Sequence, residues 1–174
     1  MTMKWILLIV FALASEIGIA QKEVRAKDVE SLVDKIVRNE YGREWAQGIN
    51  KWRRSCRALE GAKSGDSIFI CIDLIPWEAS YREVVLIGDS AFGFTTQWDT
   101  GECSRLIDEG LRKLCNIVRN GDVEEMKKLT VGKEEGERIL DLAPTNVICA
   151  RREGGTYRYE SKKVYVVDCE ESRK

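Results

Sequence analysis

Hydrophobic residues recur every three or four positions in the first third of the chain, and this spacing places them on one face of a helix. The residues on this face are Val29, Leu32, Val33, Ile36, Val37, Tyr41, Trp45, Ile49, Trp52, Cys56 and Leu59. We therefore predict a long N-terminal helix over residues 26 to 60 that ends at Gly61. Because a glycine costs a helix about 1 kcal/mol relative to alanine, we expect a bend at Gly42 and Gly48.

Past this helix the hydrophobic pattern changes to an alternation of period two, which is typical of β-strands. Residues 67 to 75 place four aliphatic side chains on one face, and Pro76 ends this strand. A second strand covers residues 83 to 87, and a turn at residues 88 to 90 leads into further alternating positions up to Trp98. We predict a hairpin or two short strands in this region.

A second amphipathic helix follows these strands. Asp99 and Glu102 have the spacing of an N-terminal capping pair, and Asn120-Gly121 ends the helix. The hydrophobic face of this helix contains Cys103, Leu106, Ile107, Leu111, Leu114, Cys115 and Val118.

The last third of the chain predicts a short helix over residues 122 to 129, followed by strands. A strand at residues 146 to 152 and the Gly154-Gly155 turn precede strands across residues 157 to 168. Because helices and strands come in runs, without strict β-α-β alternation, we predict an α+β fold. The long N-terminal helix and the second helix would pack on one face of an antiparallel sheet.

The N-terminus has the pattern of a secretory signal peptide over residues 1 to 20. Lys4 precedes a hydrophobic run that is well short of the roughly 20 residues needed to span a membrane. Small residues at positions 18 and 20 indicate cleavage before Gln21, and cleavage after Ala14 is an alternative. We expect a secreted, extracellular protein in which residues 21–174 form one α+β domain, with no membrane span after signal removal.

Six cysteines follow the signal peptide, and an even number in an exported chain indicates disulfides. They are Cys56, Cys71, Cys103, Cys115, Cys149 and Cys169. Three disulfides can pair them in fifteen ways, and the sequence does not choose among these. The closest two cysteines are too far apart for a clustered zinc motif, so we expect neither a metal nor another cofactor.

Composition excludes several classes of function. Of the 174 residues, 28 are Lys or Arg and 29 are Asp or Glu, so the formal net charge is -1 and we expect no nucleic-acid partner. The chain contains no histidine, which excludes Ser-His-Asp and Cys-His catalysis. Gly88-Asp89-Ser90 resembles the nucleophile block of GDSL-type esterases, which require a histidine base. The longer segment from Val84 to Thr95 resembles the phosphate loop of small GTPases, but Phe94 replaces the required lysine.

Asp73 is the charged residue within the hydrophobic strand at residues 68 to 75. A partly buried carboxylate there, paired with Glu78, Asp89 or Asp99, would suit glycoside cleavage without histidine. The competing interpretation is that Asp73 faces water on a half-exposed strand. Asp73 is therefore the candidate catalytic residue of an alternative function, a carboxylate-dependent extracellular hydrolase.

Trp77 and Trp98 are the candidate binding residues because each lies in a predicted loop next to a strand. Pro76-Trp77 resembles the Pro-Trp loop that cystatins insert into the clefts of cysteine proteases, and this resemblance implies a protease inhibitor. The central Gln-x-Val-x-Gly motif of that family is not found in the sequence. Since each catalytic motif lacks a required residue, we predict a secreted, non-catalytic binding protein whose partner is an extracellular protein or a small ligand.

Overall fold

The computed structural model describes residues 21–75, 78, 80–97, 99–140 and 142–167. The predicted signal peptide, the Pro76-Trp77 loop, Trp98 and Cys169 lie outside these residues.

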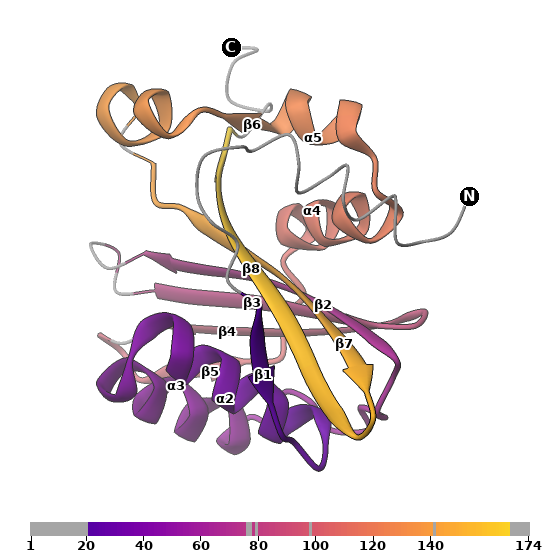
Figure 1. Ribbon diagram of the computed structural model, residues 1–174. Helices are drawn as coiled ribbons and strands as arrows, with labels where there is room; N and C mark the ends of the chain where they lie inside the picture. Colours follow the sequence, from indigo (N-terminus) through magenta and orange to yellow (C-terminus); the bar gives the residue numbers. More distant parts are fainter. Residues whose placement is uncertain (1–20, 76–77, 79, 98, 141, 168–174) are drawn as a thin grey trace.

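Helices pack against a strongly twisted antiparallel sheet (Figure 1). In chain order the elements are β1 (Lys22–Val24), α2 (Val29–Tyr41), α3 (Arg43–Ser55), β2 (Ser67–Ile75), β3 (Ser80–Ile87), β4 (Ser90–Gln97), β5 (Glu102–Ser104), α4 (Glu109–Asn120), α5 (Val123–Leu129), β6 (Thr130–Val131), the π-helix η2 (Glu135–Ile139), β7 (Thr145–Glu153) and β8 (Thr156–Val166). The strand order is β1-β8-β7-β2-β3-β4-β5, and β6 pairs with the far end of β8. The predicted combination of helices with an antiparallel sheet is confirmed.

Helices cover both faces of the sheet, whereas the sequence analysis placed them on one face. The α2–α3 pair covers the face that presents Ile68, Ile70 and Ile72, and α4 covers the face that presents Phe69 and Cys71 (Figure 1). A strand that is buried on both faces carries hydrophobic side chains at consecutive positions, as β2 does. The sequence analysis considered only the alternating aliphatic residues at positions 68 to 74, which face α2 and α3. The residues between them, such as Phe69 and Cys71, are also hydrophobic and indicate that the other face is buried as well.

The long N-terminal helix expected over residues 26 to 60 is two helices, α2 and α3, separated at Gly42. The backbone of Gly42 has φ 84° and ψ 171°, a conformation open essentially to glycine alone. The expected bend is therefore a complete break at Gly42, whereas Gly48 lies inside α3 and leaves it continuous. The helical region also ends earlier than predicted, at Ser55.

The second long helix begins later than predicted. Asp108, and not Asp99, is its N-cap residue, and the Asp108 carboxylate accepts a hydrogen bond of 2.9 Å from the Leu111 amide. The preceding segment forms β5 and then crosses β4 so closely that a Cβ atom at Gly93 would lie 2.2 Å from the carbonyl oxygen of Leu106. This crossing brings α4 to the second face of the sheet.

Two further predictions about this region are confirmed. The helix ends at Gly121, which has φ 69° in the left-handed region, and the short helix over residues 122 to 129 is α5. Among the described residues, no helix has the length and hydrophobicity to cross a membrane.

Candidate functional site

Asp73 lies in β2, where an arginine and a threonine bind its carboxylate. Arg82 on β3 lies 2.9 Å from one oxygen of Asp73, and the hydroxyl of Thr145 on β7 donates to the other oxygen. Burial raises the pKa of Asp73, while the hydrogen bond from Thr145 and the charge of Arg82 act in the opposite direction. The Asp73 carboxylate is thus already occupied by protein groups.

Among the described residues, the partners of the Asp73 carboxylate are Arg82 and Thr145, and they do not include Glu78, Asp89 or Asp99, the carboxylates named in the sequence analysis. Asp89 lies in the β3–β4 turn, at the opposite end of β3 from Arg82, and Glu78 is exposed in the β2–β3 connection. The carboxylate nearest in the network is Asp108, which lies 3.1 Å from the guanidinium of Arg82. Neither the open pocket beside the β7–β8 turn nor the one along α4, both described below, includes any of these residues.

Arg53 is the centre of a buried polar network between α3 and the sheet. Its guanidinium is fully buried and makes a bidentate pair with Glu83 on β3, with N–O distances of 2.6 and 3.0 Å. It also donates to Asp34 at 2.8 Å and to the Asn50 side chain at 2.6 Å. Burial opposes the guanidinium charge, but Glu83, Tyr81 and Asp34 outweigh it and raise the pKa of Arg53. The network holds α2 and α3 on the sheet.

Sequence reasoning missed this network because arginine is rarely fully buried. A signal was present, since Ala46, Ile49, Asn50 and Arg53 have the spacing of one helical face and all four are buried.

One disulfide of the three expected joins Cys56 and Cys103, and it links the end of α3 to β5. Cys71, Cys115 and Cys149 have free, buried thiols, and Cys169 lies outside the described residues. The even number of cysteines could not show which of them are paired and which are free. Pairing depends on which side chains the sheet and helices bring into contact.

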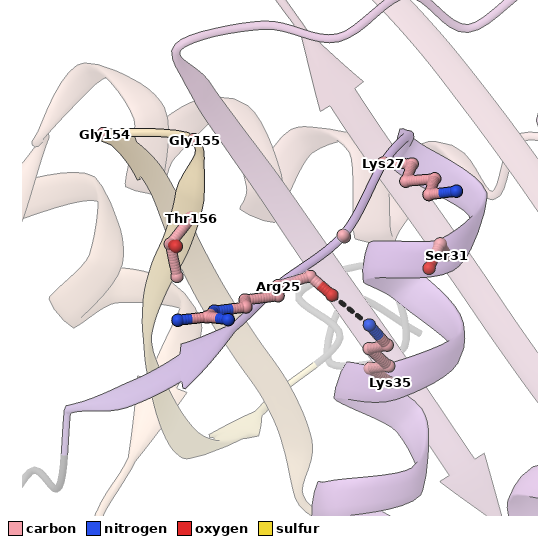
Figure 2. A pocket seen from close by; sticks show the side chains of 8 residues that line it. Arg25, Lys27, Ser31, Lys35, Gly154, Gly155 and Thr156 are labelled. Carbon is pink, nitrogen blue, oxygen red and sulfur yellow. Dashed lines mark hydrogen bonds between the residues drawn. The ribbon is translucent and has the colours of Figure 1, made fainter.

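An open pocket of about 560 Å³ lies between the start of α2 and the β7–β8 turn (Figure 2). Figure 2 shows Arg25 between the turn and α2, with Lys27 just before α2 and Ser31 on the first turn of the helix. The residues that line the pocket are Arg25, Ala26, Lys27, Ser31, Lys35, Gly154, Gly155 and Thr156. We call this site the basic pocket, because three of its eight residues are cations and none is an acid.

The sheet edge and α2 together position the basic pocket. β1 pairs with β8, with Val24 opposite Tyr157, so Arg25 emerges beside the β7–β8 turn. Glu40 on α2 anchors this edge, since it accepts hydrogen bonds from Lys22 at 2.6 Å and from Ser161 at 2.9 Å. Side chains from segments more than 110 residues apart therefore meet at one opening.

The cations of the basic pocket are available to a ligand. Within the described part of the chain, Arg25 and Lys27 make no ion pair, and both are exposed. The ammonium of Lys35 donates to the backbone carbonyl of Arg25, which leaves its charge uncompensated by a carboxylate. The Gly154-Gly155 turn has positive φ at both residues and adds no side chain that could obstruct the opening. An anionic group fits this arrangement of charge.

A second open pocket lies along α4 and has mixed charge. Its lining includes Arg112 and Lys113, but also Glu109 and Asp122, and Arg112 is paired with Glu109 at 3.2 Å. This ion pair and the two acidic residues make it a weaker candidate for an anionic ligand.

The two tryptophans proposed from sequence as binding residues lie outside the described residues, so the protease-inhibitor interpretation stays a prediction. Among the residues that the structure describes, no three potential ligands gather in a way that could hold a metal ion.

Comparisons with protein-family models, with curated proteins and with solved structures found no match to this chain.

Proposed function

We propose that this protein is a secreted, disulfide-stabilised binding protein without catalytic activity, and that its ligand carries an anionic group. The observation that supports this most strongly is the basic pocket, where Arg25, Lys27 and Lys35 surround one opening. Sulfate and phosphate esters are compact oxoanions that accept several charge-assisted hydrogen bonds from such side chains. The ligand class is therefore a sulfated or phosphorylated molecule.

The state of Asp73 supports a binding role over the hydrolase alternative. A carboxylate pair for glycoside cleavage needs an open site with about 5–9.5 Å between its two carboxyl groups. Asp73 is instead bound by Arg82 and Thr145, and its side chain is only 14% exposed. We expect no hydrolysis of polysaccharides or aryl glycosides by the protein from Gln21 onward. Turnover that the substitution Asp73→Asn abolishes would establish the hydrolase instead.

Calorimetric titration tests the proposed ligand class. The probes are inositol hexasulfate and inositol hexakisphosphate, which share one scaffold, with unmodified inositol as the neutral control. We expect at least one of the two anions to bind, and the stronger of them identifies the type of ester. Because exposed charges are screened by salt, the affinity should fall as the ionic strength rises from 0.05 to about 0.5 M.

A matched pair of variants separates the basic pocket from general charge attraction. Arg25→Gln/Lys27→Gln removes two positive charges from the pocket, and Lys51→Gln/Lys63→Gln removes two from exposed positions outside both pockets. We expect the pocket variant to lose at least about tenfold in affinity, or ~1.4 kcal/mol, and the control variant to lose much less. Equal losses in both variants would contradict a specific site.

Secretion is tested on the complete chain expressed in a eukaryotic cell. We expect the protein to accumulate in the medium with Gln21 as its first residue. Retention in the cell with residues 1 to 20 intact would contradict export.

A further inference from the structure

The cations of the basic pocket continue in a row along α2. Ser31, Lys35 and Arg38 are spaced by four and then three residues, which places them on one face of the helix. Figure 2 shows Lys27, Ser31 and Lys35 one after another from the start of α2, beside the opening. Arg38 lies one turn beyond Lys35 and does not line the pocket. We call these four residues the α2 row; at a rise of about 1.5 Å per residue, its helical part is about 10 Å long.

The cations of the α2 row are exposed, and no carboxylate neutralises them. Lys27, Lys35 and Arg38 all have exposed side chains. Within the part of the chain that the structure describes, neither Lys27 nor Arg38 makes an ion pair. The ammonium of Lys35 donates to a backbone carbonyl, which holds its position without removing its charge. Three positive charges therefore lie in sequence along one exposed face.

The acidic side chains of the same helix have partners of their own. Asp34 and Glu30 both pair with Arg54 of α3, Glu30 at a distance of 3.7 Å. Glu40 accepts hydrogen bonds from β1 and β8 at the sheet edge. Asp28 caps the helix, where its carboxylate accepts a hydrogen bond of 2.7 Å from a backbone amide of the first turn. The net charge that α2 presents at the row is therefore positive, although the chain as a whole is slightly acidic.

We propose that the ligand is an extended sulfated polysaccharide, which places one sulfate in the basic pocket and others along the α2 row as far as Arg38. This inference rests on the proposed function and names its ligand class more closely. A compact oxoanion needs the pocket alone and gives Arg38 nothing to bind. Sulfate esters repeated along a sugar chain instead present a series of anions that is complementary to the row.

The side chains at the site favour a sugar chain over a nucleic acid. Proteins that bind single strands combine cations with aromatic side chains on which the bases stack. Neither the pocket lining nor the α2 row contains an aromatic residue. The hydroxyls of Ser31 and Thr156 lie among the cations, and each can donate and accept hydrogen bonds with the hydroxyls of a sugar. We therefore expect sulfate charge and chain length to determine the affinity.

Calorimetric titration with heparin-derived oligosaccharides of two lengths tests the proposal. A disaccharide is the compact probe and an octasaccharide is the extended one. Concentrations are counted per disaccharide unit, so that the longer chain gains nothing merely from its larger number of units. We expect the octasaccharide to bind at least about tenfold more tightly, because every contact after the first is made within one complex. Equal affinities per unit would overturn the proposal.

A single variant separates the α2 row from the pocket. Arg38→Gln should lose about threefold or more in affinity for the octasaccharide and keep its affinity for inositol hexasulfate, since Arg38 does not line the pocket. Lys51→Gln removes an exposed cation from α3 and is the matched control, which should keep both affinities. Equal losses for the two variants would overturn the proposal, as would equally tight binding of a thymidine oligonucleotide of the same charge.

The two probes also distinguish this proposal from the proposed function. Binding of inositol hexasulfate without a gain for the octasaccharide refutes the extended ligand and leaves the anion-binding pocket standing. Absence of binding by every anionic probe refutes both. A gain for the octasaccharide that depends on Arg38 supports both.

Discussion

Replacement of Arg53 by methionine should destabilise the protein strongly, because it leaves the carboxylate of Glu83 without its counter-ion in the core. The side chain of Glu83 is 1% exposed, and its bidentate partner is the fully buried guanidinium of Arg53. Removal of one member of a buried ion pair typically costs about 3–5 kcal/mol. Such a loss is a large share of the roughly 5–15 kcal/mol by which domains are stable.

The neighbouring arginine offers a matched control for this experiment. Arg54 also pairs with Asp34, but its side chain is 59% exposed, so Arg54→Met should cost at most about 1 kcal/mol. The double variant Arg53→Met/Glu83→Leu should recover most of the loss, since an apolar pair of similar volume often replaces a buried ion pair at little cost. Urea unfolding followed by tryptophan fluorescence gives the free energies of unfolding. Equal losses for Arg53→Met and Arg54→Met would mean that Glu83 does not depend on Arg53 as a buried counter-ion.

Three further predictions concern stability. Burial raises the pKa of Asp73 above its ordinary value of 3.8, so the folded state binds this proton more tightly than the unfolded state and ionisation lowers stability. The free energy of unfolding of Asp73→Asn, relative to that of the unsubstituted protein, should therefore increase as the pH rises from 3.8, and unfolding curves across pH that show no such increase would contradict this. Replacement of both Cys56 and Cys103 by serine should lower the free energy of unfolding by about 4 kcal/mol. This value follows from the chain-entropy model and the sequence separation of 47 between the two cysteines. A denaturant titration that shows no loss would contradict it. Gly42→Ala should lower the stability by about 1–3 kcal/mol because Gly42 has a positive φ, whereas Gly48→Ala inside α3 should raise it by up to about 1 kcal/mol. Melting temperatures of the two variants that shift in the same direction would contradict this prediction.

Sequence patterns predicted the elements whose signals are local. The strand over residues 67 to 75 matches β2, and the Gly154-Gly155 turn joins β7 to β8 as expected. The end of α4 at Gly121 and the short helix α5 were also predictable, because capping residues and glycine act within one or two turns.

Features that depend on distant contacts were missed or misplaced. The apolar periodicity of Leu106 and Ile107 suggested a helix, but the passage of this segment over Gly93 fixes it in a non-helical path. Hydrophobic spacing alone gave no reason to separate α2 from α3 at Gly42. In both cases tertiary packing outweighs the local pattern.

The candidate site shows the same division between local and distant signals. Asp73 was identifiable as an unusual charge in a hydrophobic strand, but its partners Arg82 and Thr145 come from two other strands. The basic pocket was invisible in a chain with a net charge of -1, because its cations gather only when β1 pairs with β8 and α2 begins beside their turn. Local clustering of charge is a property of the fold and not of the composition.

The most direct test of the anion-binding role is an NMR titration of the ¹⁵N-labelled protein from Gln21 with the hexasulfate and hexakisphosphate of inositol. Backbone amides near a bound anion change their chemical shifts, so they report where it binds. We expect chemical-shift changes confined to residues 25–35 and to the turn at Gly154 and Gly155, and their loss in the Arg25→Gln/Lys27→Gln variant. Shift changes along α4 instead, or none with either anion, would contradict the assignment of the basic pocket as the binding site.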